Sequence, residues 1–181
     1  MNLLLRLTWL LLSFNFRPRL VAPFGASALD FRVWPNDLDT NLHTNNGRYL
    51  TLMDLGRVDL ILRGGMWKII FKNRWQPILS GAIIRYRREL KPFQRFTLQS
   101  RIVYWSNKNF VMEQVFMAKD ANGKDIIAAK ALVRGGIYCR KDRHFVDVAR
   151  LFADIGYAGD APSPTPDVET FLASEDALKR V

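Results

Sequence analysis

Residues 37–49 read Asp37-Leu38-Asp39-Thr40-Asn41-Leu42-His43-Thr44-Asn45-Asn46-Gly47-Arg48-Tyr49. The stretch holds two acids, one of the chain's two histidines and several small polar residues that favour loops. A long apolar-periodic segment follows from Tyr49, so the polar loop runs directly into a helix N-terminus. Free backbone N–H groups and the positive end of the helix dipole receive negative charge there. An acid just ahead of such a site suits acyl-transfer chemistry.

The segment from residue 46 to residue 63 is predicted to be one long, buried helix. Asn45 or Asn46 can cap it, because a short amide side chain accepts the orphan N–H groups of the first turn. Gly64-Gly65 is a natural C-terminal stop. Apolar residues cover nearly the whole circumference, which favours a buried helix over a surface one: Leu50, Leu52, Met53, Leu55, Val58, Leu60, Ile61 and Leu62.

Strand patterns surround this helix. Residues 30–34 are predicted to form a first strand that Pro35 ends, and residues 66–75 a short helix. Ile127, Ala129, Ala131 and Val133 are expected on one face of the last strand, and Asn122-Gly123 is a strong hairpin signal before it. Period-2 alternation with one apolar face predicts an antiparallel sheet wrapped over the helix. Four such patterns follow the helix, within residues 82–87, 95–104, 110–119 and 127–134.

The predicted fold class is therefore α+β, with a curved antiparallel sheet of about five strands wrapped around one long central helix. Peripheral helices are expected at both ends of the chain. We divide the chain into residues 1–27, an apolar N-terminal segment and linker, residues 28–140, the main domain, and residues 141–181, a C-terminal helical extension and tail.

Residues 1–16 are apolar but too short a run to span a bilayer, and Arg6 interrupts them. A signal peptide is an alternative because Ala26-Ser27-Ala28 resembles a cleavage site, although no basic side chain precedes the apolar run. We expect an N-terminal helix that packs on the domain, on a partner or on a membrane surface. The expected location is cytoplasmic, with residues 1–16 as the candidate membrane contact.

Composition narrows the function. The chain has 181 residues and 49% hydrophobic content, enough for a real core. Its net charge of +10 implies an anionic partner, which is a phosphorylated small molecule, a nucleic acid or an acidic membrane, unless the charge serves solubility alone. One cysteine, Cys139, excludes an intrachain disulfide, and His43 and His144 show no metal-ligand spacing. No nucleic-acid-binding motif accompanies the charge, so no nucleic-acid partner and no metal are expected.

These residues resemble a family signature. Asp37-x-Asp39, His43, Asn45-Asn46 and Tyr49 are similar to the D-x-D-x-x-G-H-x-N-N-x-x-Y pattern of hotdog-fold acyl-CoA thioesterases of the 4-hydroxybenzoyl-CoA thioesterase-like superfamily. The closest resemblance is to the subgroup typified by thioesterase superfamily member six. Arg57, the stretch from Arg85 to Leu90 and Trp105 also look like that subgroup, and the similarity covers about residues 28–140.

The resemblance implies an enzyme of lipid metabolism that hydrolyses an acyl-CoA or acyl-carrier-protein thioester without a cofactor. It assigns the chemistry to Asp39, as a nucleophile that forms an acyl-enzyme anhydride or as a general base for water, with Asn46 as the second catalytic candidate. Backbone N–H groups around Asn46 and Gly47 would hold the thioester oxygen. It also implies a homodimer or homotetramer with substrate bound across an interface. The substrate-binding candidates are His43, Asn45, Gly47, Tyr49 and Arg87; further basic candidates for the CoA phosphates are Arg85, Arg88, Arg101 and Lys108.

The residue types alone support plainer roles for several of these positions. Asp37 is expected to order the loop, Tyr49 to lie in the core with its hydroxyl as a polar handle, and Arg57 to need a buried polar partner. Leu42 stands where many relatives have Gly, which lets the backbone approach a ligand. Leu42 and Asn46 therefore keep open a non-catalytic acyl-CoA or lipid-binding protein. A hotdog dehydratase and a nucleic-acid-binding domain are weaker alternatives, the latter resting on charge alone.

Overall fold

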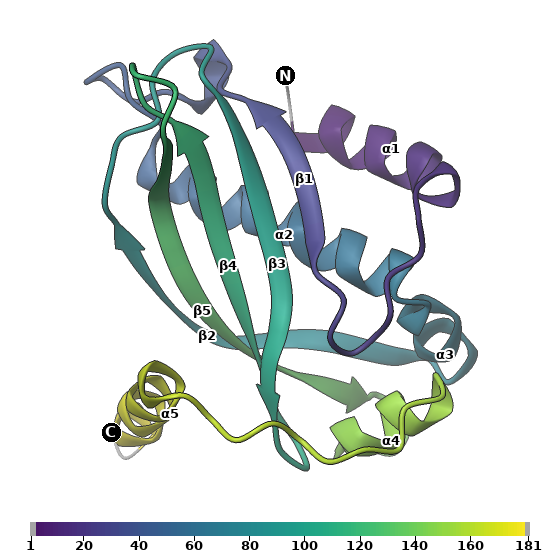
Figure 1. Ribbon diagram of the computed structural model, residues 1–181. Helices are drawn as coiled ribbons and strands as arrows, with labels where there is room; N and C mark the ends of the chain where they lie inside the picture. The colour runs from purple at the N-terminus through teal and green to yellow at the C-terminus, as the bar shows by residue number, and fades with distance from the viewer. Residues whose placement is uncertain (1–2, 180–181) are drawn as a thin grey trace.

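A long helix, α2 (Asn46–Arg63), lies against the concave side of a curved antiparallel sheet in the computed structural model, which describes residues 3–179 (Figure 1). The sheet has six strands in the order β1-β3-β4-β5-β2, with β6 paired to β5. This confirms the predicted α+β architecture. The strands are β1 (Ser27–Arg32), β2 (Trp75–Tyr86), β3 (Arg95–Trp105), β4 (Phe110–Lys119), β5 (Asp125–Cys139) and β6 (His144–Val146).

Two strands differ in extent from the sequence pattern. Strand β1 runs over Ser27–Arg32 and so both begins and ends earlier than residues 30–34. Strand β2 begins at Trp75, well before residue 82, where its pattern becomes readable. A bulge between Leu79 and Gly81 breaks the alternation in its first half, and bulges and strand glycines hide a period-2 signal. The β4–β5 hairpin turns at Asn122-Gly123 as predicted, with φ of +78° at Gly123.

A second bulge changes the inward face of β5. Phe116 pairs with Ala129 but Met117 pairs with Ile127, so Ala128 is an extra residue in the strand. The backbone N–H groups of Arg87 and Arg88 both donate to the Ala128 carbonyl. The prediction that Ile127 shares a face with Ala129 is therefore wrong. The bulge shifts the alternation by one residue, leaving Ile127 exposed and packing Ile126 against the core.

Helix α2 buries one face on the sheet. Leu52, Met53 and Leu55 pack in a core with Leu98 and Phe116. The opposite side is more open than its apolar pattern predicted, since Leu50 is exposed and the remaining apolar residues of that side are only partly buried. Helix α1 (Leu3–Ser13) covers part of it (Figure 1).

Polar groups lock α2 to the sheet beneath it. The fully buried Gln114 side chain donates to the Met53 carbonyl (3.0 Å) and to Ser100 Oγ (2.8 Å), and it accepts from Arg57 Nη1 (2.9 Å). Arg57 therefore has the polar partner that its position required, and it also pairs with Asp54. Gly56 permits this close approach, because a Cβ there would lie 2.3 Å from Ser100 Oγ.

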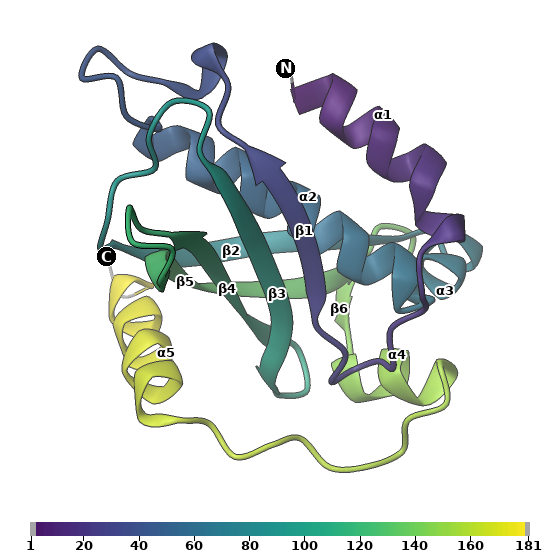
Figure 2. The same cartoon turned by 45° about the horizontal axis from the view of Figure 1, so that its top comes forward.

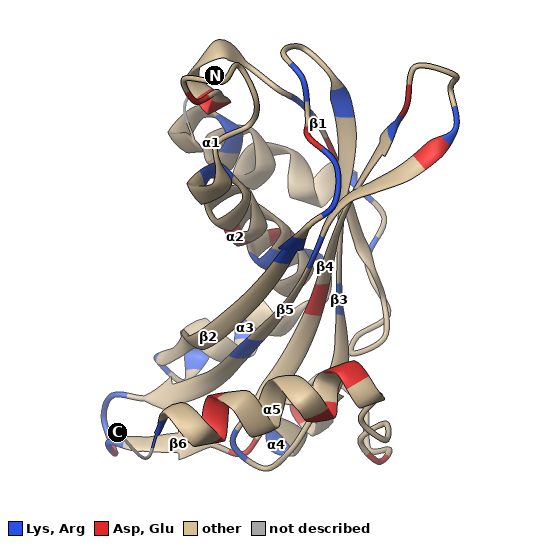
Figure 3. Cartoon of the chain, turned by 90° about the vertical axis from the view of Figure 1, so that its left-hand side faces the viewer, with Lys and Arg blue, Asp and Glu red and all other residues tan. Residues whose placement is uncertain are grey.

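The terminal helices lie at opposite ends of the molecule (Figure 2). Helices α3 (Met66–Lys72) and α4 (Val148–Asp154) join a second core cluster, to which α4 contributes Leu151 and Phe152. Helix α5 (Pro166–Leu178) covers the outer face of the sheet through Val168 and Phe171. Two of its acids pair with basic side chains of β5, and Figure 3 shows the acidic positions along α5 in red. Residues 1–2, the start of the predicted apolar N-terminal segment, and residues 180–181 lie outside the described part of the chain.

Candidate active site

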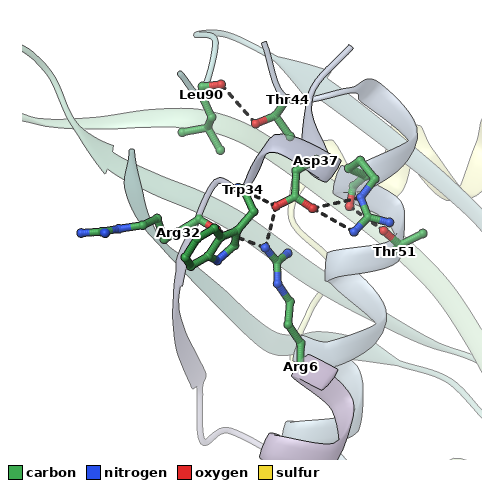
Figure 4. A network of polar contacts seen from close by, with 8 residues as sticks. Arg6, Arg32, Trp34, Asp37, Thr44, Thr51 and Leu90 are labelled. Atoms are coloured by element: carbon green, nitrogen blue, oxygen red, sulfur yellow. Dashed lines mark hydrogen bonds and ion pairs between the residues drawn. The ribbon is translucent and has the colours of Figure 1, made fainter. Parts of the chain in front are cut away.

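Asp37 is the buried anchor of the loop that precedes α2 (Figure 4). Its side chain is 1% exposed. Oδ2 accepts from Arg6 Nη2 (2.5 Å) and from the Trp34 N–H (3.0 Å), and Oδ1 accepts from Arg48 Nη2 (2.8 Å). One carboxylate thus ties α1, the short 3-10 helix η2 (Pro35–Asp37) and the first turn of α2 together. Asp37 orders the loop, as its residue type suggested.

The same contacts set the protonation of Asp37. Burial alone would raise its pKa, but the Trp34 N–H and the guanidinium groups of Arg48 and Arg6 stabilise the charged form more strongly. The net result is a pKa below the ordinary value of 3.8. Asp37 is therefore ionised at neutral pH, and its carboxylate is occupied by the ion pairs with Arg6 and Arg48.

Asp39 closes the next turn of the loop on itself. Its N–H donates to the His43 carbonyl (2.8 Å), and its carboxylate Oδ1 accepts from the N–H groups of Asn41 (2.8 Å) and His43 (3.3 Å). Leu42 has a φ of 60° in this turn, a left-handed conformation that glycine adopts most readily. The Asp39 side chain is half-buried, so it is both positioned and partly accessible to solvent.

The start of α2 has its own cap. Asn45 Oδ1 accepts the Gly47 N–H at 2.8 Å, which confirms the predicted cap, and the Arg48 N–H donates to the Asn45 carbonyl at 2.9 Å. Within residues 3–179, the structure shows no protein acceptor for the Asn46 N–H. Asn46 and Gly47 are both exposed, so this helix start faces solvent.

His43 is tied to a neighbouring loop. Its Nε2 lies 2.8 Å from Glu89 Oε2, and both side chains are partly exposed. The adjacent Thr44 is buried, and both its N–H and its hydroxyl donate to the Leu90 carbonyl at 3.1 Å. The loop before α2 is therefore held on the segment between β2 and β3.

Tyr49 is a core residue. It is 2% exposed and packs edge-on against Tyr86 and Phe116, with ring centroids 5.0 and 4.9 Å away. Burial, with a contribution from Tyr86, raises the pKa of Tyr49 to about 12. The structure thus shows the core role expected for Tyr49, and its contact with substrate stays a prediction. The Tyr86 hydroxyl donates to the Asn46 carbonyl (3.1 Å) and so joins the end of β2 to the start of α2.

A basic hollow opens beside that junction. It has a volume of about 560 Å³ and is lined at one side by Arg85, Tyr86, Arg87 and Arg88, and at the other by residues 125–127 of β5. Arg87, predicted from the sequence, thus lies with two of the other basic candidates. Arg101 is held by Glu113 (2.6 Å) instead, and Lys108 follows β3 in a separate turn. Tyr86 was missed because its position between arginines carried no separate signal.

Groups suited to metal binding or thiol chemistry are not gathered here. Across residues 3–179 there is no cluster of three or more His, Cys, Asp or Glu side chains that could hold a metal ion. Cys139 is buried and donates to Asp142 Oδ2 at 3.3 Å. The arrangement offers a half-buried carboxylate, an open helix N-terminus and a cationic hollow.

Comparison with known sequences finds one matching family model and several related proteins. Residues 33–173 match the thioesterase-like superfamily. The chain is 36% identical over 86 residues to protein THEM6 of Xenopus laevis, which covers 48% of this chain and 42% of that protein. It is 32% identical over 115 residues to protein THEM6 of Danio rerio, covering 64% of this chain and 57% of that protein. The matches thus span about half the length of these curated relatives.

Solved structures share the fold. The probable thioesterase YbaW of Escherichia coli superimposes with a TM-score of 0.64 at 20% identity, over 71% of this chain and 94% of that one. The second example is an aspartate-to-asparagine mutant of 4-hydroxybenzoyl-CoA thioesterase in complex with 4-hydroxybenzoyl-CoA. It gives a TM-score of 0.65 at 11% identity, over 73% of this chain and 99% of that one. Both matches confirm the hotdog arrangement of sheet and central helix.

Proposed function

Because the chain belongs to the thioesterase-like superfamily, we propose that it is an acyl-CoA thioesterase, which hydrolyses a thioester to a free carboxylate and a thiol. One observation carries this proposal. A half-buried acid, Asp39, is held in a closed turn directly ahead of the α2 N-terminus, and a cationic hollow adjoins the same helix start. Asp39 acts on the thioester, and the helix start receives the charge that develops on its oxygen.

Two routes use Asp39. As a nucleophile, a carboxylate oxygen bonds to the thioester carbonyl carbon and the C–S bond breaks. The thiolate leaves and takes a proton from a water molecule, and the hydroxide that remains attacks the anhydride, which releases the acyl group as the free acid and restores the Asp39 carboxylate. As a general base, Asp39 instead takes a proton from the water that attacks the same carbon, and it passes that proton to the departing thiolate.

The α2 N-terminus supplies the oxyanion donor in both routes. The Asn46 N–H is the primary donor because the described chain offers it no acceptor. The Gly47 N–H joins it when the Asn45 side chain yields its hydrogen bond. Preorganised backbone donors of this kind contribute about 3–4 kcal/mol each to the transition state when no water competes. The exposed Asn46 side chain is the second polar group at this position.

The basic hollow receives the CoA phosphates in this proposal. Arg85, Arg87 and Arg88 supply the positive charge at its rim. His43 and Asn45 hold the loop and the helix start through Glu89 and Gly47, and Tyr49 supports Tyr86 from beneath. This division separates residues that position the site from those that contact substrate.

The proposed functional unit is a homodimer or a larger homo-oligomer. Strand β2 is long and has a partner on one side only within the described sheet. Leu79 and Ile83 on this edge are exposed. Unpaired apolar strand edges pair readily with a second chain. Pairing there would bring a second copy beside Arg85 and Tyr86, and so beside the start of α2.

A second candidate function is binding of acyl-CoA or lipid without turnover. It is favoured by Leu42, whose exposed side chain stands in the turn that Asp39 closes. A large side chain there narrows the approach to the carboxylate. This alternative predicts tight association of acyl-CoA with no release of thiol.

A panel of acyl-CoA esters tests the proposal. Thiol release is followed with aryl and fatty acyl esters of increasing chain length, in parallel with the affinity of each ester and of a nucleic-acid duplex at two salt concentrations. Turnover of one ester class supports the thioesterase. Tight ester binding with no thiol release on any chain length supports the binding protein. Salt-sensitive duplex binding without ester affinity would contradict both.

A further inference from the structure

The positive charge of the chain is concentrated in two segments. Residues 1–29 and 60–88 together contain ten Lys or Arg residues and no Asp or Glu, while acids and bases balance over the rest of the chain. The whole net charge of +10 therefore arises in these two segments. In the fold they supply α1, the linker after it, α3 and β2.

Helix α1 presents an apolar stripe to solvent. Its inner side is occupied by Leu3, Arg6, Leu7 and Leu10, which pack on or bind to the domain. The stripe on the outer side consists of Leu5, Trp9 and Leu12, spaced at helical intervals, and continues to Phe16 in the short 3-10 helix η1 (Phe14–Phe16) that follows α1; all four side chains are exposed. Single exposed apolar residues need no explanation, but a continuous stripe with a tryptophan marks an interaction surface.

Helix α3 extends this apolar surface. The Phe14 ring contacts Trp67 edge-on at 6.2 Å, and Trp67 contacts Phe71 at 6.3 Å. Phe71 is 75% exposed. Figures 1 and 2 both show α1 and α3 on the same side of the molecule, away from α5. We call the exposed residues Leu5, Trp9, Leu12 and Phe16, together with Trp67 and Phe71, the α1–α3 surface.

A cationic cleft borders the α1–α3 surface. It has a volume of about 660 Å³, and its charged lining residues are four cations, Arg17, Arg19, Arg63 and Lys68, and one acid, Asp154. Arg17 and Arg63 bind the fully buried Asp59 at 2.7 and 3.0 Å, so two of these cations share one acid. Arg19 and Lys68 have no carboxylate partner within residues 3–179. Lys72 and Arg74 add exposed charge at the end of α3.

We propose that the α1–α3 surface docks on an anionic phospholipid bilayer, with the apolar stripe among the acyl chains and the cleft facing lipid phosphates. Exposed Trp and Leu bordered by Lys and Arg form the pattern of a helix that lies in the membrane interface. No helix within residues 3–179 is long and apolar enough to cross a bilayer. A second copy of the chain is disfavoured as the occupant, because self-association would bring two cationic borders together.

Vesicle flotation tests the proposal on the full chain. Vesicles of phosphatidylcholine alone are compared with vesicles that also contain phosphatidylglycerol. Leu12→Glu is set against Leu178→Glu, a control that changes a leucine of matched exposure (68% and 70%) on α5 at the far side. We expect the wild type and Leu178→Glu to float with anionic vesicles only, and Leu12→Glu to bind at least tenfold more weakly.

The cationic cleft is tested by the double variant Arg19→Gln/Lys68→Gln. The control is Lys124→Gln/Lys141→Gln, which removes the same amount of charge from exposed positions outside the cleft. Two charges near an anionic bilayer correspond to about a 30-fold change in partitioning, and the control pair should change it less than about threefold. Equal flotation of all variants would overturn the proposal. So would an absence of vesicle binding together with a dimer that Leu12→Glu dissociates. Flotation needs no turnover, so neither result depends on the thioesterase activity.

Discussion

The buried pair between Arg6 and Asp37 should respond asymmetrically to mutation. In Asp37→Asn, Arg6 stays in place with its side chain 2% exposed but loses the opposite charge, and the single amide oxygen cannot replace both carboxylate oxygens that accept from Arg6, Arg48 and the Trp34 N–H. Leaving a buried cation without its acid costs about 3–5 kcal/mol of the free energy of unfolding. Arg48 also loses its partner in this variant, which adds to the loss.

In Arg6→Met, by contrast, Asp37 keeps Arg48 and the Trp34 N–H. Arg6 Nη1 is buried without a hydrogen-bond partner, so the substitution also removes an unsatisfied donor. Losing hydrogen bonds to a charged group costs about 1.5–3 kcal/mol, and the relieved donor offsets part of that. We therefore expect Arg6→Met to cost at least about 1 kcal/mol less than Asp37→Asn.

Urea unfolding followed by tryptophan fluorescence measures both losses and their coupling. The double variant should be more stable than the sum of the single losses implies, by about 1–3 kcal/mol. Arg32→Met and Asp125→Asn, at exposed positions, are controls expected within about 0.5 kcal/mol of wild type. An Arg6→Met loss equal to or larger than that of Asp37→Asn would refute the reasoning.

The pH dependence of the Asp37→Asn effect has a definite sign. The pKa of Asp37 is lowered on folding, so its charged form stabilises the native state. That contribution is complete above the ordinary pKa of 3.8 and is lost as the pH falls from there toward the lower native pKa. The stability gap between wild type and Asp37→Asn should be constant near neutral pH and should shrink below about pH 4.

Three further outcomes follow from the site and the core. Gly56→Ala puts a Cβ 2.3 Å from Ser100 Oγ and should lower the free energy of unfolding in urea by about 1–3 kcal/mol. An unchanged unfolding midpoint would contradict the close packing of α2 on β3. Arg85→Gln/Arg87→Gln should raise the KM for acyl-CoA about tenfold and leave kcat unchanged. The rise in KM should be smaller at high salt, and an unchanged KM would show that the basic hollow does not bind CoA. Ile83→Lys on the β2 edge should shift the sedimentation coefficient toward the monomer, and an unchanged oligomer would place the interface elsewhere.

Local patterns predicted the elements well. The apolar period from Tyr49, the Asn45 cap and Gly64-Gly65 bounded α2, and Asn122-Gly123 located the hairpin. Strand β6 was not predicted because its three residues are too few for a period to be read. The bulges in β2 and β5 were not predicted either. An extra residue in a strand only interrupts the alternation of apolar and polar residues, and nothing in the sequence distinguishes that interruption from the end of the strand.

Long-range pairing was the main gap. Arg6 meets Asp37 across 31 residues, and Arg17 meets Asp59 across 42, and nothing in one sequence links such positions. Arg6 therefore looked like an interruption of an apolar run, although it anchors α1 to the loop. Likewise, the motif named Tyr49 without showing that Tyr86 covers it and contacts the helix start.

The most direct test of the thioesterase account is the kcat of Asp39→Asn on the best acyl-CoA ester. Asparagine keeps an oxygen that can accept from the Asn41 and His43 N–H groups, so the turn should persist and the urea midpoint should stay unchanged. We predict that kcat falls at least about 100-fold, because the amide is neither nucleophile nor base. A folded Asp39→Asn with a kcat within about threefold of wild type would contradict the assignment of the chemistry to Asp39.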